Sequence, residues 1–229
     1  MNVAALMPVK GFRNAKQRLS SLLPSAAREL FAETMFRDVL RQVRMARGLA
    51  GTFVVTGDEK VAAIAAAAGA KVIREGKEKG ETSAVDFARL ELKNAGCEAV
   101  LIIPGDMPLV SAADIEQVLA QVPEGTALPF TLLVPSHDRL GTNALLLAPP
   151  DVIELRFGYD SFTFHMTQVK AQGLPIRTIE NEHIALDIDE PKDFDRLLSC
   201  EPDGGESVRL ARALLAEQNL KVIRPSGVL

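Results

Sequence analysis

The sequence predicts a single α/β domain built on a mostly parallel sheet. Apolar runs with the length of buried strands alternate with segments of helical apolar spacing, which is the pattern of βαβ units with right-handed crossovers. One such run, at 100–103, ends in a turn that carries Asp106, and Ser111 then begins a capping-box pattern for the next helix. We therefore expect Asp106 at the carboxyl end of a strand, the edge at which open α/β sheets bind ligands.

The composition agrees with one globular domain. The chain has 229 residues, which suits one large domain better than two, and it is 47% hydrophobic and 24% charged. A net charge of -4 argues against non-specific binding to DNA or RNA, whose affinity comes from clustered Lys and Arg.

Cysteine usage and hydropathy bear on the compartment. Cys97 and Cys200 lie far apart and share no ligand spacing, so neither a zinc site nor a disulfide framework is expected. The apolar run at 3–7 is too short for a signal-peptide core, and no run approaches the roughly 20 residues that span a bilayer. We expect a cytoplasmic protein with no membrane or nucleic-acid partner.

The first half of the chain repeats strand and helix in a regular order. Phe31, Met35, Val39 and Val43 recur at the spacing of an amphipathic helix. Glycines that follow the helical segments are suited to their C-terminal caps. The predicted order is a strand at 3–7, a basic loop, a helix at 25–47, a strand at 53–56, a helix at 58–68, a strand at 71–73, a helix at 82–96, and the strand and helix on either side of Asp106.

The second half is less regular. Apolar runs at 132–135 and 144–147 predict strands that flank a polar connection, 136–143, which could floor a ligand pocket. A further helix is expected to end at Gly173. The remaining predictions are strands at 176–179 and 183–188, a helix from Pro191 to about 198, linker composition at 201–206 and helical spacing at 208–216.

Three acids fall at the ends of predicted strands: Asp106, Asp187 and Asp189. Mg²⁺ prefers carboxylate oxygens and usually takes one or two from the protein, the rest coming from water and substrate phosphates. The arrangement suits chemistry on a metal-bound nucleotide. The alternative is that Asp106 and Asp189 only cap the helices that follow them.

The basic loop after the first strand supplies a second component. Lys10 and Lys16 could reach triphosphate oxygens as point charges, whereas the alternative is a solvated loop without a specific partner. The chain contains neither GxxxxGK(S/T) nor GxGxxG, which disfavours a P-loop protein and a dinucleotide-binding Rossmann enzyme.

Gly141-Thr142-Asn143, Gly158 and Ser161 form a third component. Glycine lets backbone amides approach an anion, and a hydroxyl at a helix start adds a donor, so a phosphate or carboxylate could be held there. Ordinary turn chemistry is the alternative. His165 lies about one turn after Ser161 and could face the same pocket, although a helix histidine is more often structural. No GxSxG element is present, and covalent catalysis is disfavoured.

Several motifs in register, from about residue 3 to about 198, closely resemble the guanylyltransferases of coenzyme F420 biosynthesis. The residues that carry this resemblance are Pro8-Val9-Lys10, Ala15-Lys16-Gln17-Arg18-Leu19, Gly105-Asp106-Met107-Pro108-Leu109, Gly141-Thr142-Asn143-Ala144, Phe157-Gly158, Ser161-Phe162, His165 and Leu186-Asp187-Ile188-Asp189 with Pro191. The Gly-Asp-x-Pro element alone would indicate only the wider nucleotidyltransferase group. The tail does not map onto the family core, so we interpret 1–198 as the nucleotidyltransferase domain and 199–229 as its C-terminal appendage.

The resemblance implies a GT-A-like fold, Rossmann-like, with helices on both faces of a mixed sheet. It also implies that GTP and a small phosphorylated three-carbon acid react to give a guanylylated product and pyrophosphate. The acceptors in the family are phosphoenolpyruvate, 2-phospho-L-lactate and 3-phospho-D-glycerate. The site residues implied are Lys10, Lys16 and Asp106 as catalytic residues, Asp106, Asp187 and Asp189 as Mg²⁺ ligands, and Thr142, Gly158 and Ser161 as binders of the acceptor.

Two other functions stay open at this point. Asp187-Ile188-Asp189 also has the Asp-x-Asp spacing by which GT-A sugar transferases hold a metal and a nucleotide sugar, and a non-catalytic nucleotide-binding module would need its acids only as helix caps. The sequence does not decide the acceptor, because small substituents are discriminated by pocket details. Guanine preference rests on the resemblance alone, and the oligomeric state is open, a homodimer included.

Overall fold

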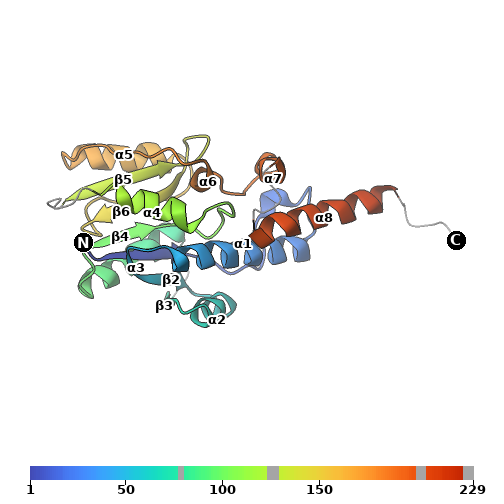
Figure 1. The fold of residues 1–229 in the computed structure, drawn as a ribbon, viewed down its shortest axis with the longest axis horizontal. Coiled ribbons are helices and arrows are strands. Elements are labelled where there is room, and N and C mark those ends of the chain that lie inside the picture. Colours follow the sequence, from blue (N-terminus) through green and yellow to red (C-terminus); the bar gives the residue numbers. More distant parts are fainter. Residues whose placement is uncertain (77–79, 123–128, 200–204, 224–229) are drawn as a thin grey trace.

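A computed structural model describes residues 1–76, 80–122, 129–199 and 205–223, with the backbone alone described from 218 onward. Its centre is a sheet of six strands in the order β3-β2-β1-β4-β6-β5 (Figure 1). β1 pairs in parallel with β2 and β4, and β2 with β3, whereas β6 runs antiparallel to β4 and β5. The predicted mostly parallel, mixed sheet is confirmed. The bounds are β1 Val3–Pro8, β2 Leu49–Thr56, β3 Lys71–Arg74, β4 Ala99–Ile102, β5 Phe130–Pro135 and β6 Thr142–Ala148.

Helices cover both faces of this sheet. The side chains of β1 alternate between the faces: Ala5 and Met7 belong to a core with α1, α2 and α4, and Ala4 and Leu6 to a second core with α3 and α5. The bounds are α1 Ser25–Met45, α2 Glu59–Ala67, α3 Glu81–Asn94, α4 Ala112–Ala120, α5 Ser161–Ala171, α6 Glu182–Ala185, α7 Pro191–Ser199 and α8 Gly205–Ile223, with a short 3-10 turn at Gln17–Leu19.

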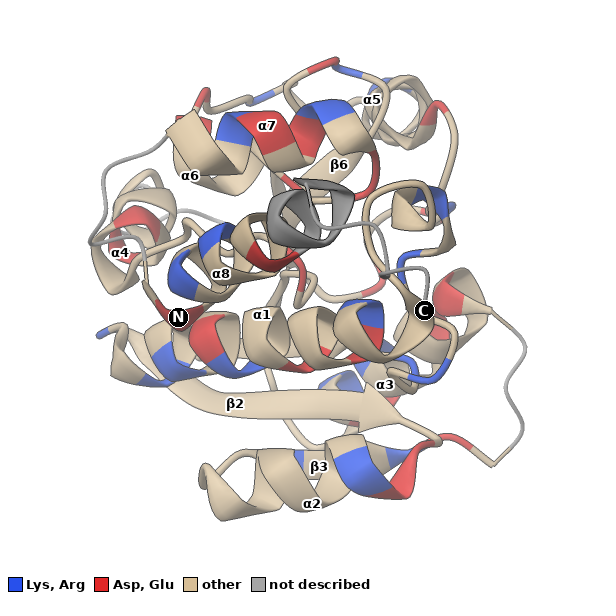
Figure 2. Cartoon of the chain, turned by 90° about the vertical axis from the view of Figure 1, so that its right-hand side faces the viewer, with Lys and Arg blue, Asp and Glu red and all other residues tan. Residues whose placement is uncertain are grey.

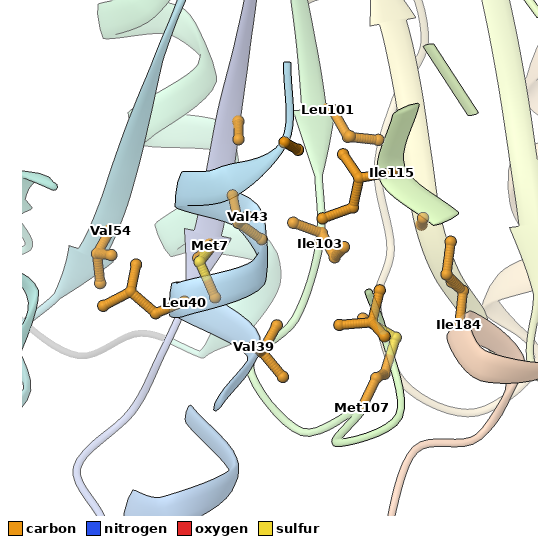
Figure 3. Packing of buried hydrophobic residues seen from close by; sticks show 14 of the residues in the cluster. Met7, Val39, Leu40, Val43, Val54, Leu101, Ile103, Met107, Ile115 and Ile184 are labelled. Atoms are coloured by element: carbon orange, nitrogen blue, oxygen red, sulfur yellow. The ribbon is translucent and has the colours of Figure 1, made fainter. Parts of the chain in front are cut away.

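The first of these cores anchors the loop that follows β4. Ile103 and Met107, on either side of the turn that carries Asp106, are 1% and 0% exposed. Figure 3 shows Ile103 beside Ile115 of α4, within the layer between the sheet and the helices. Because close-packed side chains leave little room to shift, the turn is held in place at both ends. Asp106 is thereby fixed at the carboxyl edge of the sheet.

The start of α4 forms as the sequence predicts. The Ser111 hydroxyl accepts a hydrogen bond from the Asp114 amide, and the Asp114 carboxylate accepts one from the Ser111 amide, so the capping box is complete. Asp114 also accepts one hydrogen bond from the Asn181 side-chain amide, at 2.8 Å, and its other carboxylate oxygen lies 3.0 Å from His183 Nδ1. This one acid therefore links α4 to the segment that contains α6.

The C-terminal helix α8 packs against α1 and α7 (Figures 1 and 2). The Asp38 carboxylate on α1, 3% exposed, accepts hydrogen bonds from the amide and the hydroxyl of Ser207, each 2.7 Å long. Val208 and Ala211 of α8 are 0% exposed in the same apolar cluster. The linker expected at 201–206 lies mostly outside the described residues, as does Cys200.

The strands predicted at 176–179 and 183–188 are wrong. Residues 182–185 form the short helix α6, and the earlier segment contributes only an isolated bridge between Thr178 and Leu133. Asn181 caps this helix by accepting a hydrogen bond from the Ile184 amide. Ile184, Leu186 and Ile188 are all buried. The apolar residues alternate along the sequence because one side of this irregular segment faces the core, and not because the segment is a strand of the sheet.

Charge is mixed over the surface. Figure 2 shows acidic and basic residues interspersed over the end of the molecule where α1, α7 and α8 meet. In the part of the chain that the structure describes, no helix has the length and apolar character needed to cross a membrane.

Candidate active site

Two pockets adjoin at the carboxyl edge of the parallel strands. The larger, about 770 Å³, is lined by the loop after β1 and the starts of α2 and α3. The smaller, about 440 Å³, is lined by the β5–β6 connection and the loops that precede α5 and α7. Both volumes lie within the usual range for small-molecule sites. Glu81, Pro104, Asp106 and Asp189 line both pockets, so the two compartments meet at a group of acids.

Lys16 lies at this junction and joins two of the predicted acids. Its ammonium group donates to Asp106 Oδ2 and to Asp189 Oδ1, at 2.8 Å each. Its backbone is left-handed, with φ of 52°, an uncommon conformation for a lysine. Burial alone would lower the pKa of Lys16, but the charges of Asp106 and Asp189 outweigh it and raise the pKa above its ordinary value. Lys16 therefore stays charged at the junction of the two pockets.

Asp187 is held by a different partner. Its carboxylate accepts a hydrogen bond of 3.0 Å from the Asn143 side chain, whose amide group also donates to the Ile184 carbonyl. Burial, together with the nearby charge of Asp106, raises the pKa of Asp187 to about 6, although the Asn143 bond acts in the opposite direction. The Ile188 amide donates to the Asp106 carbonyl, which brings the two acid-bearing loops together.

Glu81 completes the acidic group and was not singled out from the sequence. It is the first residue of α3 and lines both pockets. Burial and the charge of Asp106 raise its pKa to about 7, against the opposing effect of Lys10 and Lys16. The sequence places Glu81 at the end of a charged segment, one residue before the predicted helix, where the positive end of the helix dipole already explains an acid, so nothing in the sequence marked it as a site residue.

The larger compartment is formed where the basic loop faces the second strand. Lys10 lines it, and Asp58 at the start of α2 lies directly opposite Gly11. A Cβ atom at Gly11 would lie 2.5 Å from Asp58 Oδ2, so a larger residue at this position would displace the Asp58 side chain. Lys10 and Lys16 thus line the same pocket, and Lys16 also reaches the shared acids.

The smaller compartment contains the third predicted group. The Thr142 amide donates to the Ser161 hydroxyl at 3.0 Å, and both side chains are at least nine-tenths buried in its wall. Gly158 has φ of +104°, which a residue with a side chain rarely adopts. The polar connection at 136–143 lines the pocket, as predicted. The three residues expected to bind an acceptor are therefore neighbours in space.

His165 does not face this pocket and lies one layer behind it. The side chain is 0% exposed, and its Nδ1 atom is 2.9 Å from Thr142 Oγ1. Burial, with smaller effects from the charges of Arg156 and Arg89, lowers the pKa of His165 to about 4. The histidine is therefore neutral near pH 7. Of the two alternatives left open by the sequence, the structure favours the buried structural histidine, and it connects this side chain to a residue that lines the pocket.

The acids at the junction of the two pockets offer carboxylate oxygens, the ligand atoms that a divalent cation such as Mg²⁺ prefers. Among the described residues, no three His, Cys, Asp or Glu side chains are already arranged to hold a metal ion. Mg²⁺ needs only one or two carboxylates when phosphate and water supply its other ligands. Asp187 is a half-buried carboxylate with a raised pKa and lies close to the charge of Asp106, and a bound cation would relieve both effects. The carboxylates of Asp106, Asp187 and Asp189 are therefore suited to such an ion.

Comparison with known proteins identifies relatives over most of the chain. The family described as "Guanylyl transferase CofC like" matches residues 3–210. A phosphoenolpyruvate guanylyltransferase from Rubrobacter xylanophilus is 36% identical over 93% of this chain and 100% of its own. A 3-phospho-D-glycerate guanylyltransferase from Colwellia psychrerythraea is 32% identical, covering 86% of this chain and 91% of its own. A 2-phospho-L-lactate guanylyltransferase from Methanothermobacter thermautotrophicus is 29% identical, with 86% and 85% covered.

Solved structures with low sequence identity share the fold. A protein from Desulfovibrio desulfuricans G20, provisionally named a nucleotide-diphospho-sugar transferase, matches with a TM-score of 0.75 at 16% identity, covering 95% of this chain and 98% of its own. The CMP:2-keto-3-deoxy-manno-octonic acid synthetase complexed with CTP matches with a TM-score of 0.59 at 14% identity, covering 95% and 100%. The GT-A-like nucleotidyltransferase fold predicted from the sequence is confirmed.

Proposed function

The chain belongs to the CofC-like guanylyl transferase family, and from this premise we propose that it transfers GMP from GTP to the phosphate of a small phosphorylated three-carbon acid, with release of pyrophosphate. The relatives are named for phosphoenolpyruvate, 2-phospho-L-lactate and 3-phospho-D-glycerate, which share this chemistry. The observation that carries the proposal is the pair of unequal pockets that meet at Asp106, Asp189 and Glu81. The larger takes GTP and the smaller takes the acid.

The nucleophile in this reaction needs no catalytic base. A phosphate oxygen of the acceptor attacks the α-phosphorus of GTP. The bond between this phosphorus and the oxygen that bridges the α- and β-phosphates breaks, and pyrophosphate leaves. A phosphate monoester has a second pKa near 6 and is largely deprotonated at neutral pH. The protein therefore has to align two anionic reactants and reduce their mutual repulsion.

The residues at the junction of the pockets supply the positive charge. Lys16 lies where the transferred group passes between the compartments, and Lys10 lies along the triphosphate side. We assign Asp106, Asp187 and Asp189 to Mg²⁺, which would neutralise charge on the phosphates. When substrates bind, Lys16 exchanges part of its bonding with Asp106 and Asp189 for phosphate oxygens. The acids keep the lysine charged and in position until then.

The smaller pocket supplies hydrogen-bond donors to the acceptor. We assign Thr142 and Ser161 hydroxyls and the backbone at Gly158 to an anionic end of the acid. Hydroxyls and backbone amides can bind an anion without adding a fixed charge to the smaller pocket. The charge of Lys16 then remains for the phosphates at the junction of the two pockets.

A pyrophosphate-release assay tests the proposal. The full chain is incubated with GTP and Mg²⁺ and with each of the three acids in parallel, and at least one acid is expected to give turnover. With that acid, replacing GTP by ATP, CTP or UTP is expected to give less pyrophosphate. EDTA is expected to abolish that turnover. Mg²⁺-dependent GTP binding without turnover for any of the three acids would contradict the proposal and indicate a nucleotide-binding module instead.

A further inference from the structure

The two ring nitrogens of the buried His165 have different partners. The backbone amide of Arg156 donates to Nε2 at 3.2 Å, and Thr142 Oγ1 lies 2.9 Å from Nδ1. A backbone amide can only donate, so Nε2 must accept and carries no proton. A neutral imidazole has one N–H group, and this places it on Nδ1.

The tautomer of His165 sets the direction of the next hydrogen bond. Because Nδ1 carries the proton, it donates to Thr142 Oγ1, which becomes the acceptor. The hydroxyl proton of Thr142 is then directed elsewhere. Within the described residues no protein group accepts it, and Thr142 lines the smaller pocket.

Ser161 is placed in the same way. Its hydroxyl oxygen accepts a hydrogen bond from the Thr142 backbone amide, so its own proton is also left to donate. Ser161 lies on α5, one turn before His165, and lines the same pocket. Two neighbouring hydroxyls are therefore committed as donors in the pocket wall, which suits an anionic oxygen and disfavours a ligand group that only donates.

The third acceptor residue depends on the same histidine. Arg156, whose amide binds His165, is two residues before Gly158, and the next amide, that of Phe157, donates to Thr82 Oγ1 at 3.0 Å. The Phe157 ring packs edge-on to His165, with ring centroids 5.4 Å apart. One imidazole thus holds the loop that carries Gly158 on one side and the Thr142 hydroxyl on the other.

We propose that His165 is a positioning residue that orients the Thr142 hydroxyl as a hydrogen-bond donor to an anionic oxygen of the acceptor acid. The inference rests on the proposed function, because it assigns the smaller pocket to that acid. His165 does not touch the substrate. Its contribution passes through Thr142 and through the loop that carries Gly158, so removing it affects recognition of the acceptor and leaves the GTP compartment, on the other side of the shared acids, unchanged.

A double-mutant cycle tests this connection. His165→Phe keeps an aromatic ring and removes both nitrogens, and Thr142→Val keeps the branched shape and removes the hydroxyl. We expect each to raise the KM of the acceptor by about tenfold, the effect of losing one hydrogen bond to a charged group, and to leave the KM of GTP within about twofold. Because His165 acts on the acceptor through Thr142, the increase in KM for the double variant is expected to be clearly smaller than the product of the two single increases.

Conservative variants provide the matched controls. His165→Asn keeps an N–H donor near the place of Nδ1 and is expected to recover part of the acceptor KM, and Thr142→Ser keeps the hydroxyl and is expected to recover most of it. Thermal melting of every variant checks folding, and the cycle can be repeated with His165→Asn if His165→Phe does not fold. Additive effects of the two substitutions, or equal increases in both KM values, would overturn the inference. Absence of turnover in the unmodified chain would instead overturn the proposed function.

Discussion

At the scale of single residues, the charges of the site are unevenly compensated. Lys16 pairs with Asp106 and Asp189, whereas Asp187 receives a neutral amide bond from Asn143. Burial and the neighbouring Asp106 raise the pKa of Asp187 to about 6 as a result. Metal binding requires the deprotonated carboxylate, so we expect this residue to be important for the cation.

Replacement of an acid by its amide tests that role. Asp187→Asn and Asp106→Asn keep the size of the side chain and remove its charge, so each is expected to lower GTP- and acceptor-dependent pyrophosphate release by about a thousandfold. The control is Asp151→Asn, which removes an acid that pairs with Lys93 away from both pockets. Near-normal rates in both site variants would contradict the metal assignment.

The buried histidine predicts a pH dependence of stability. His165 has a pKa of about 4 in the fold, against an ordinary value of 6.5, so the folded state prefers the neutral ring. This preference contributes to the free energy of unfolding. The contribution is fully present above about pH 6.5 and is lost as the pH falls from there toward 4, and the loss is at most about 3 kcal/mol. Urea unfolding between pH 7.5 and 4.5 measures this loss.

The matched variants separate His165 from the other titrating groups. His165→Asn cannot titrate, so its free energy of unfolding is expected to fall less steeply over the same range. His183→Asn, at a side chain that is 55% exposed, serves as the control for the loss of a histidine. Parallel curves for His165→Asn and the unmodified chain would rule out a buried, neutral His165.

At the scale of elements, local sequence patterns predicted a helix or strand correctly where capping or apolar spacing was consistent along the whole segment. The capping box at Ser111 and the helical spacing in α1 both formed where the sequence predicts them. The same reasoning failed at 183–188, where Ile184, Leu186 and Ile188 alternate because one side of an irregular segment is buried. Alternation reports burial on one side, and a strand also needs a free edge to pair with, which is a property of the rest of the fold.

The capping box gives a prediction for α4. Ser111→Ala removes the acceptor for the Asp114 amide and one donor to its carboxylate, so the free energy of unfolding is expected to fall by about 1 kcal/mol. Chemical denaturation measures it. Ser21→Ala, at an exposed loop position, is the control and is expected to change little. Equal values for the two variants would show that the box contributes no stability.

At the scale of the whole molecule, one buried acid ties the C-terminal helix to the domain. Asp38 accepts two hydrogen bonds from Ser207 and pairs with Arg41. Asp38→Ala leaves the buried Ser207 amide and hydroxyl without an acceptor, so the free energy of unfolding is expected to fall by about 2 to 3 kcal/mol.

Two measurements check the Asp38 prediction. Urea denaturation gives the free energy, and limited proteolysis shows whether α8 becomes accessible to cleavage. Asp195→Ala removes an exposed acid from α7 and serves as the control. Unchanged stability together with unchanged protection of α8 would mean that the apolar contacts of Val208 and Ala211 are enough to hold the helix.

The sequence by itself determined the order of most elements, the α/β class, and the placement of Asp106 in a turn between a buried strand and a capped helix. These depend on spacing, capping and burial within a few residues of each other. The tertiary structure decided which distant groups meet: Lys16 with Asp106 and Asp189, Asn143 with Asp187, and His165 with Thr142. Such contacts depend on strand order and on the packing of loops, and local patterns carry no information about either. Glu81 shows the difference plainly, since only the folded chain places that helix-start acid between the two pockets.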